Sequence, residues 1–205
     1  MDKKEKGTIY RDGKKIEPKT ISDSLERFKI AYITENRKEE GLLLNSSLIT
    51  NLNITIWHDI ASKFLRFINR RKEIFNAESM VKKLDIKTTG ISQVVNTLSG
   101  GNQQKVSIGK WLITKSEVLI FDEPTVGIDV GAKEYIHQLI FDLAGKERKS
   151  IILISSDMPE IIKLANRIIV FHEKKIIGEV KDLNKFGNDY DTISKMIGDC
   201  YLGTA

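Results

Sequence analysis

The strongest structural signal in the sequence is the stretch Val118-Leu-Ile-Phe-Asp122-Glu123-Pro124-Thr125. Its first four residues are apolar, which is typical of a strand buried on both faces of a parallel sheet. Two adjacent carboxylates, Asp122 and Glu123, follow at the carboxyl end of that strand, where open α/β sheets bind their ligands. Alone, so short a pattern is also typical of a solvated strand end followed by a turn.

Short apolar runs of the same kind recur towards the C-terminus. We expect strands over 151–154 and 168–171, with helical spacing of apolar residues over 135–143 and 161–165. Buried strands that alternate with amphipathic helices indicate an α/β protein built on a parallel sheet. The last stretch, 182–205, predicts one or two C-terminal helices.

The N-terminal part predicts a small mixed region. An Asp-Gly pair at 12–13, between two β-compatible runs, indicates a tight hairpin over 8–16. Helical spacing over 21–28 and an apolar strand over 30–33 follow. The charged stretch 35–41 ends in a glycine and predicts a loop.

We divide the chain into three segments of one partial domain. Residues 1–40 hold the hairpin, the first helix, the first strand and the charged loop. Residues 41–116, with helical spacing from 42 to 84, form a helical subdomain, and residues 117–205 form the α/β core with the C-terminal helices. The total length of 205 residues is enough to bury a sizeable core.

The composition is that of a soluble globular protein, with 40% hydrophobic and 30% charged residues and a net charge of +5. The apolar runs are far shorter than the roughly 20 residues that cross a bilayer. We find no signal peptide, and the single cysteine, Cys200, makes no internal disulfide, so we expect a cytoplasmic chain. We interpret the one dense basic cluster as a solvated helix face rather than a nucleic-acid patch; it consists of Arg66, Arg70, Arg71 and Lys72.

A second informative segment, Leu98-Ser-Gly-Gly-Asn-Gln-Gln-Lys105, lies upstream, with Ser99 23 residues before Asp122. A serine and two glycines before a helical run predict a helix N-terminus with an exposed backbone. The hydroxyl, the free N–H groups and the positive end of the helix dipole are all suited to a phosphate. An ordinary serine cap next to a glycine turn is the alternative interpretation.

In combination these segments resemble the nucleotide-binding domains of ABC transporters, in order and spacing over 8–180. The segment from Leu98 resembles the ABC signature motif, and 119–125 resembles the Walker B segment. Gly127-Ile-Asp129-Val-Gly131-Ala-Lys133 resembles the D-loop, and Ile154-Ser-Ser156-Asp157 the switch region.

Finer details resemble the second nucleotide-binding half of bacterial monosaccharide importers of the ribose, galactose and xylose type. These details are Asn102-Gln-Gln-Lys105, the segment 127–133, Ser155-Ser-Asp-Met-Pro-Glu160 and Ile33-Thr-Glu35-Asn-Arg-Lys38.

The resemblance implies a role for each motif residue. The signature residues would contact, in trans, the γ-phosphate of ATP held by a second nucleotide-binding domain; they are Ser99, Gly100, Gly101, Asn102 and Gln103. Asp122 would serve Mg²⁺ and Glu123 would be the general base. Asp129 would bridge the two halves of the dimer.

Two motif positions depart from the family pattern. Glu35 lies where most members have the Q-loop glutamine, which links the nucleotide site to the membrane subunit. Ser156 lies where a switch histidine would hold the γ-phosphate. A hydroxyl donates one hydrogen bond but lacks imidazole chemistry.

The largest departure is that Gly-x-x-x-x-Gly-Lys-[Ser/Thr] occurs nowhere in the sequence. The resemblance therefore implies an incomplete α/β fold of the P-loop NTPase (ABC ATPase) type, with an inserted helical subdomain and without the P-loop strand and helix. We expect an N-terminally truncated domain that leaves apolar sheet surface to be covered by a partner. We also expect weak or absent binding of ATP and Mg²⁺ by the isolated chain, and no ATP hydrolysis.

The function that this resemblance implies is that of an ATP-binding component of an ABC-type sugar importer, peripheral at the inner face of the cell membrane. Its partners would be a second nucleotide-binding domain, membrane permease subunits and, indirectly, a sugar-binding protein. One alternative is a non-catalytic regulatory module, or an inactive gene remnant, of such a transporter. An ABC-type ATPase that acts on nucleic acid is disfavoured, because no long heptad run and no Cys-x-x-Cys occurs.

Overall fold

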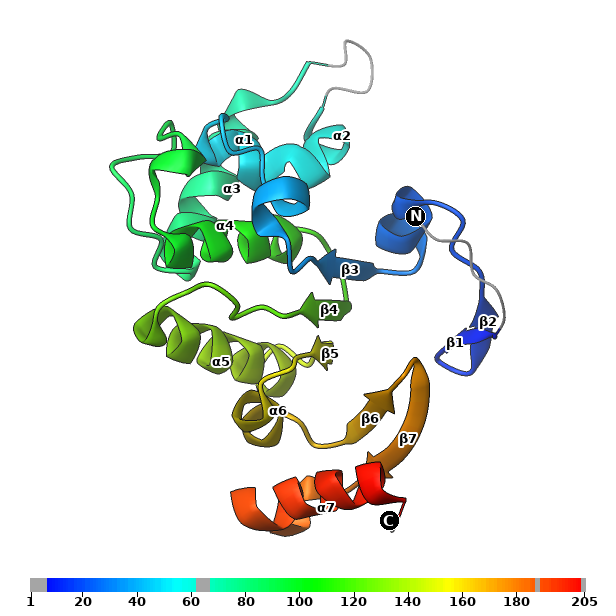
Figure 1. The fold of residues 1–205 in the computed structure, drawn as a ribbon. Helices are drawn as coiled ribbons and strands as arrows, with labels where there is room; N and C mark the ends of the chain where they lie inside the picture. The colour runs from blue at the N-terminus through cyan, green and yellow to red at the C-terminus, as the bar shows by residue number, and fades with distance from the viewer. Residues whose placement is uncertain (1–6, 62–66, 187–188, 204–205) are drawn as a thin grey trace.

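The computed structural model describes residues 7–61, 67–186 and 189–203. Figure 1 shows the helical segment with α1, α2 and α3 at one end of the molecule and β6, β7 and α7 at the other, with β3, β4 and β5 between them. Arg66, one member of the expected basic cluster, lies outside the described residues. In the part of the chain that is described, no helix is both long and apolar enough to span a membrane.

The N-terminal hairpin is confirmed. Strands β1 (Ile9–Arg11) and β2 (Lys14–Ile16) pair antiparallel. Asp12 and Gly13 both have positive φ, 50° and 73°, as a tight hairpin turn requires. The helical spacing after the hairpin gives only a short π-helical turn, Asp23–Arg27.

A three-stranded parallel sheet forms the centre of the molecule, in the order β3 (Ile30–Ile33), β4 (Val118–Asp122), β5 (Ser150–Ile154). The expected strands at these three places are therefore confirmed. One face of the sheet is buried by helices α4 (Gly100–Leu112) and α5 (Val130–Gly145). That core contains Ala31, Ile33, Ile108, Leu119, Phe121, Ile136, Ile140 and Leu143.

The other face of the same sheet is open. Ile152 is 51% exposed and Ile154 is 48% exposed, and the ring of Tyr32 on β3 is exposed as well. The alternation of exposed and half-buried residues along β5 therefore differs from the strand buried on both faces that its apolar run predicts.

The helical segment has a core of its own. It consists of α1 (Leu48–Asn53), a 3₁₀ turn (Ile54–Ile56), α2 (Trp57–Ile60), α3 (Arg70–Lys83) and a second 3₁₀ turn (Val95–Thr97) before α4. Helix α4 approaches this core closely at Gly109, where a Cβ would lie 2.9 Å from atoms of Leu52 and of Leu84. Because α4 also covers the sheet, one helix belongs to both cores.

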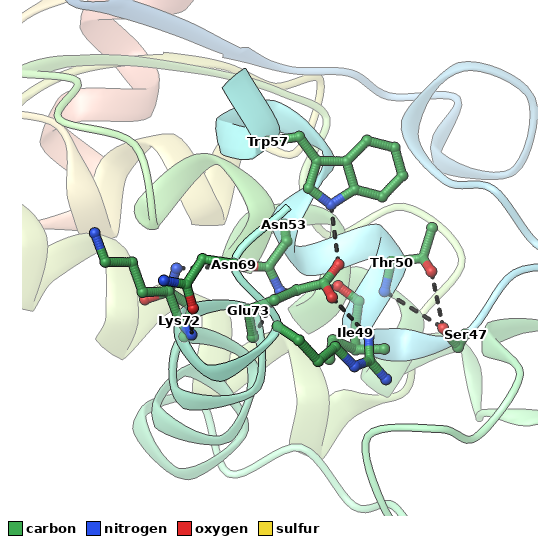
Figure 2. Close-up of polar contacts among 10 residues, drawn as sticks. Ser47, Ile49, Thr50, Asn53, Trp57, Asn69, Lys72 and Glu73 are labelled. Atoms are coloured by element: carbon green, nitrogen blue, oxygen red, sulfur yellow. Dashed lines mark hydrogen bonds and ion pairs between the residues drawn. The ribbon is translucent and has the colours of Figure 1, made fainter. Parts of the chain in front are cut away.

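A buried polar network ties α1 to α3 (Figure 2). The amide of Asn53 donates to the carbonyls of Ile49 at 2.9 Å and Glu73 at 3.0 Å. The carboxylate of Glu73 accepts from Trp57 Nε1 at 3.0 Å and from Arg70 at 2.6 Å. Trp57 is thus a half-buried packing residue whose N–H is satisfied.

The interpretation of 168–171 as another strand of the parallel sheet is wrong. Strand β6 (Ile168–His172) pairs antiparallel with β7 (Lys175–Val180) in a separate two-stranded sheet. The cause is the two-residue turn at Glu173 and Lys174, both with positive φ (46° and 64°), which reverses the chain.

The C-terminal helical prediction is confirmed. Helix α6 (Met158–Leu164) precedes β6, and a 3₁₀ turn (Leu183–Phe186) leads to α7 (Tyr190–Leu202). Helix α7 packs on β7 so closely that a Cβ at Gly178 would lie 2.2 Å from Cys200 Sγ. These elements bury a third core of their own.

Candidate functional site

The two carboxylates after β4 are both held by hydrogen bonds. Asp122 accepts from the hydroxyl of Tyr32 on the neighbouring strand, with an O–O distance of 2.5 Å. This hydrogen bond, with burial and the negative charge of Asp122, raises the pKa of Tyr32 to about 12. Tyr32 is a neighbour of the site that the sequence did not single out.

Glu123 has a strained backbone, with φ of +44° in a non-glycine residue. Its N–H donates to the carbonyl of Ile154, and its carboxylate accepts from the N–H of Ser156 at 2.6 Å. The parallel pairing of β4 with β5 is what brings these residues together. The structure therefore assembles Asp122, Glu123 and Ser156 at one end of the sheet.

The segment with the glycine pair begins α4 as expected. Ser99 is the N-cap, and its Oγ accepts from the N–H of Asn102 at 3.4 Å and from the side-chain amide of Asn102 at 2.9 Å. Gln103 is buried, and its amide donates to the carbonyls of Val95 and Leu98. Ser99 is exposed, whereas Gln103 stabilises the turn that precedes the helix.

Asp129 caps α5, because its Oδ1 accepts from the N–H of Ala132 at 2.9 Å. The start of α4 lies against this cap. A Cβ at Gly101 would be 2.7 Å from the Cβ of Ala132 and 3.5 Å from Asp129 Oδ2. The structure thus brings Ser99, Gly101 and Asp129 into a second group, on the N-termini of two neighbouring helices.

The charged stretch that predicts a loop is folded, which corrects that expectation. Residues Arg37–Gly41 form a π-helical turn in which Arg37 and Gly41 are buried. Arg37 donates to the carbonyls of Val126 at 2.9 Å and Gly127 at 3.0 Å, just before Asp129. Glu35, the residue at the Q-loop position, is exposed at the start of this segment.

A buried polar network joins α5, α6 and the turn after β4. His137 on α5 contacts the carboxylate of Glu160 on α6 at 2.8 Å, and Thr125 donates to the same carboxylate oxygen at 2.9 Å. Close by, Lys133 pairs with Asp157, which lowers the pKa of that carboxyl group. No sequence pattern indicated this network, because its members come from three separate segments.

In the described ranges, no three His, Cys, Asp or Glu side chains gather as a metal site would require. Asp122 and Glu123 already accept hydrogen bonds from Tyr32 and Ser156. The α4 N-terminus, with Gly100 and Gly101 in its first turn, has the exposed backbone that suits a phosphate.

A family profile described as "ABC transporter" matches residues 1–126. The chain is 46% identical over 182 residues to the ribose import ATP-binding protein RbsA of Oceanobacillus iheyensis, covering 88% of this chain and 36% of that protein. It is 48% identical over 176 residues to the xylose import ATP-binding protein XylG of Thermoanaerobacter pseudethanolicus, covering 86% and 34%. The chain therefore spans about a third of the length of the curated relatives it matches.

Solved structures show the same fold. The dimeric ATP-binding cassette MJ0796 bound to ADP and Pi superposes with a TM-score of 0.71 at 21% identity, covering 88% of this chain and 75% of that one. A nucleotide-free ATP-binding cassette from an ABC transporter gives a TM-score of 0.73 at 18% identity, covering 96% and 77%. With the matched profile, the motif order and this fold in agreement, the chain belongs to the ABC transporter family.

Proposed function

We propose that this chain is part of the ATP-binding component of an ABC-type sugar importer and supplies its signature residues in trans to ATP held by a second nucleotide-binding domain. The observation that carries the proposal is the start of α4, where Ser99, Gly100 and Gly101 lie beside Asp129. The sequence itself has no phosphate-binding loop. The names of the relatives, ribose and xylose import ATP-binding proteins, support the substrate class.

The start of α4 has the chemistry that a γ-phosphate requires. Helix α4 is 13 residues long, so its dipole and unpaired N–H groups present positive potential at Ser99. Gly100 and Gly101 have no side chain to cover those N–H groups. Asn102 and Gln103 keep this turn in shape through their hydrogen bonds.

The resemblance to ABC nucleotide-binding domains also assigns roles to the remaining motif residues. Asp122 is the Mg²⁺ position and Glu123 the general base, both dependent on nucleotide held by other residues. Ser156 is the switch position, Asp129 bridges to the second nucleotide-binding domain, and Glu35 faces the membrane permease. A sugar-binding protein acts indirectly through that permease, and the chain lies at the inner face of the membrane.

The trans role is tested in the intact transporter, reconstituted in vesicles with ribose or xylose as the transported sugar. Ser99→Arg places a bulky cation at the phosphate position and should abolish ATP-driven uptake without preventing assembly. Ser107→Ala, on the same helix but buried away from its start, should transport normally. Uptake that survives Ser99→Arg would refute the trans role.

The isolated chain should not hydrolyse ATP, since it lacks the residues that grip the phosphates. Phosphate release is measured with purified chain in the presence of Mg²⁺. Release that is Mg²⁺-dependent and abolished by Glu123→Gln would contradict this part of the proposal.

A non-catalytic module that docks on a permease is the second candidate. It is favoured by the hydrogen bonds of Tyr32 to Asp122 and of Ser156 to Glu123, each of which uses one oxygen of the carboxylate. Such a module would bind membrane subunits equally well with and without nucleotide, whereas the trans role predicts that ATP strengthens association with a second nucleotide-binding domain.

A further inference from the structure

Arg37 is a buried cation without a carboxylate partner. The residue is 8% exposed, and burial lowers the pKa of its guanidinium. No ion pair joins it to any of the described residues, and its Nε has no hydrogen-bond partner. Burying a charge that is compensated only by carbonyls is costly, so stability alone does not account for an arginine here.

The guanidinium group joins three segments that are distant in the sequence. It donates to the carbonyls of Val126 and Gly127, in the turn that leads from Glu123 to Asp129. It also lies against the start of α4, because a Cβ at Gly100 would be 3.4 Å from Arg37 Nη2 and 3.3 Å from the carbonyl of Gly127. Arg37 therefore contacts both the turn between Glu123 and Asp129 and the start of α4.

The last residue of the turn Arg37–Gly41 is hydrogen-bonded to α4. Lys110, a buried residue of that helix, donates to the carbonyl of Gly41. Gly41 has little free space around it, since a Cβ there would lie 3.1 Å from Ser107 Oγ and 3.2 Å from Arg37 Cβ. Residues Arg37–Gly41 consequently cannot shift without moving α4 or the turn at 126–127.

We propose that Arg37 is a positioning residue that couples the exposed segment beginning at Glu35 to the turn at Val126 and Gly127 and to the start of α4. A displacement of that segment moves the guanidinium of Arg37, and with it the turn before Asp129 and the start of α4 at Gly100. The two carbonyl contacts explain the residue type, since a planar fork spans two acceptors and a lysine ammonium does not. The proposal rests on the trans role of the signature residues.

The decisive measurement is the number of sugar molecules imported per ATP hydrolysed by the intact transporter in vesicles. Arg37→Lys keeps the charge and removes the fork, and the ratio should fall by about tenfold, in line with the loss of a charged hydrogen bond. Arg70→Lys is the matched control, because Arg70 is exposed and, among the residues that the structure describes, pairs with Glu73 alone. A merely destabilised transporter would lose uptake and hydrolysis together, with the ratio unchanged.

A second variant keeps the proposal falsifiable if Arg37→Lys fails to assemble. Lys110→Met frees the opposite end of the turn and should lower the same ratio. An unchanged ratio in either assembled variant, or an equal fall in Arg70→Lys, overturns the proposal. Ser99→Arg is measured in parallel: if it leaves uptake intact, the trans role fails, whereas lost uptake with an unchanged Arg37→Lys ratio rejects only the coupling.

Discussion

The buried polar groups of α1 and α3 differ from those of the segments that carry the motifs. In α1 and α3 the network around Asn53 and Glu73 is satisfied (Figure 2). The buried polar atoms without partners among the described residues all lie on the segments that carry the motifs; they are Arg37 Nε, Gln103 Oε1, Gln104 Oε1, Ser107 Oγ, His137 Nδ1 and Glu160 Oε2.

We call the satisfied network of α1 and α3 the scaffold, and the motif-bearing segments with the unpartnered atoms the joint. A fully satisfied buried network favours one arrangement and rigidifies the helices that contribute to it. An unpartnered buried polar atom costs free energy unless strain, chemistry, an ordered water or an ion accounts for it. The helical segment is therefore expected to unfold cooperatively when its network is cut, and the motif-bearing joint to tolerate changes at its unpartnered atoms.

The largest effect is expected for Asn53→Ala, which breaks the scaffold network. The fully buried Asn53 donates to two carbonyls and accepts from Asn76 at 3.3 Å. Losing these bonds and leaving buried carbonyls unpaired should cost about 3–4 kcal/mol of unfolding free energy, measured in urea. Asn76→Ala removes only the third bond and is the control; equal losses in the two variants would contradict this account.

The second-largest expected effect is the pH dependence that Lys110 contributes to the free energy of unfolding. Burial lowers its folded-state pKa from 10.5 to about 8. Between these values the unfolded chain still holds the proton and the folded chain has released it, so this group makes stability rise with pH. From pH 8 to 9.5 the gain should be about 1.5 kcal/mol.

Lys110→Met should remove that rise, as measured by urea unfolding at pH 8 and 9.5. Above pH 10, Tyr32 acts in the opposite direction, because its folded pKa of about 12 exceeds the ordinary 10.0. The comparison is therefore confined to the window below pH 10. A slope that is the same in wild type and Lys110→Met would disprove the effect.

A smaller effect is expected for Thr125→Val, which cuts the hydrogen bond to the buried Glu160. A hydrogen bond to a charged group contributes about 1.5 kcal/mol, and the remaining partner, His137, keeps part of the carboxylate satisfied. Thr125→Ser retains the hydroxyl and should restore most of the stability in thermal unfolding. Failure of serine to do so would assign the loss to packing.

The smallest effects compare two serines, Ser47 in the satisfied α1–α3 region and Ser107 on the motif-bearing helix α4. Ser47 caps α1, where its Oγ accepts from the N–H of Thr50 and contacts its hydroxyl at 2.9 Å, so Ser47→Ala should cost about 1 kcal/mol. Ser107 is fully buried and its Oγ has no partner, so Ser107→Ala should change stability by less than about 0.5 kcal/mol. The reverse order in urea unfolding would remove the distinction between scaffold and joint.

Local patterns predicted much of the fold because local physics governs those elements. The Asp-Gly pair is a hairpin turn, and Ser99 and Asp129 cap the helices that follow them. The apolar run at 118–121 is the central strand of the sheet. Strand 168–171 was assigned to the wrong sheet because an apolar run indicates a strand but does not specify which neighbour it pairs with.

The candidate site was predictable only in part. Asp122, Glu123 and Ser156 follow two strands whose carboxyl ends meet, so their proximity follows from the parallel pairing. Arg37 was not predictable, because in the sequence it is one of several charged residues in a row and 89 residues separate it from its first acceptor.

By itself, the amino-acid sequence determined the family, the motif order and the absence of a phosphate-binding loop, because these are properties of residue types at fixed spacing. The tertiary structure alone decided that the motif residues divide into two groups and that Arg37 lies between the turn at 126–127 and α4. The physical reason is that the role of a buried charge depends on the acceptors around it, and those acceptors come from distant parts of the chain.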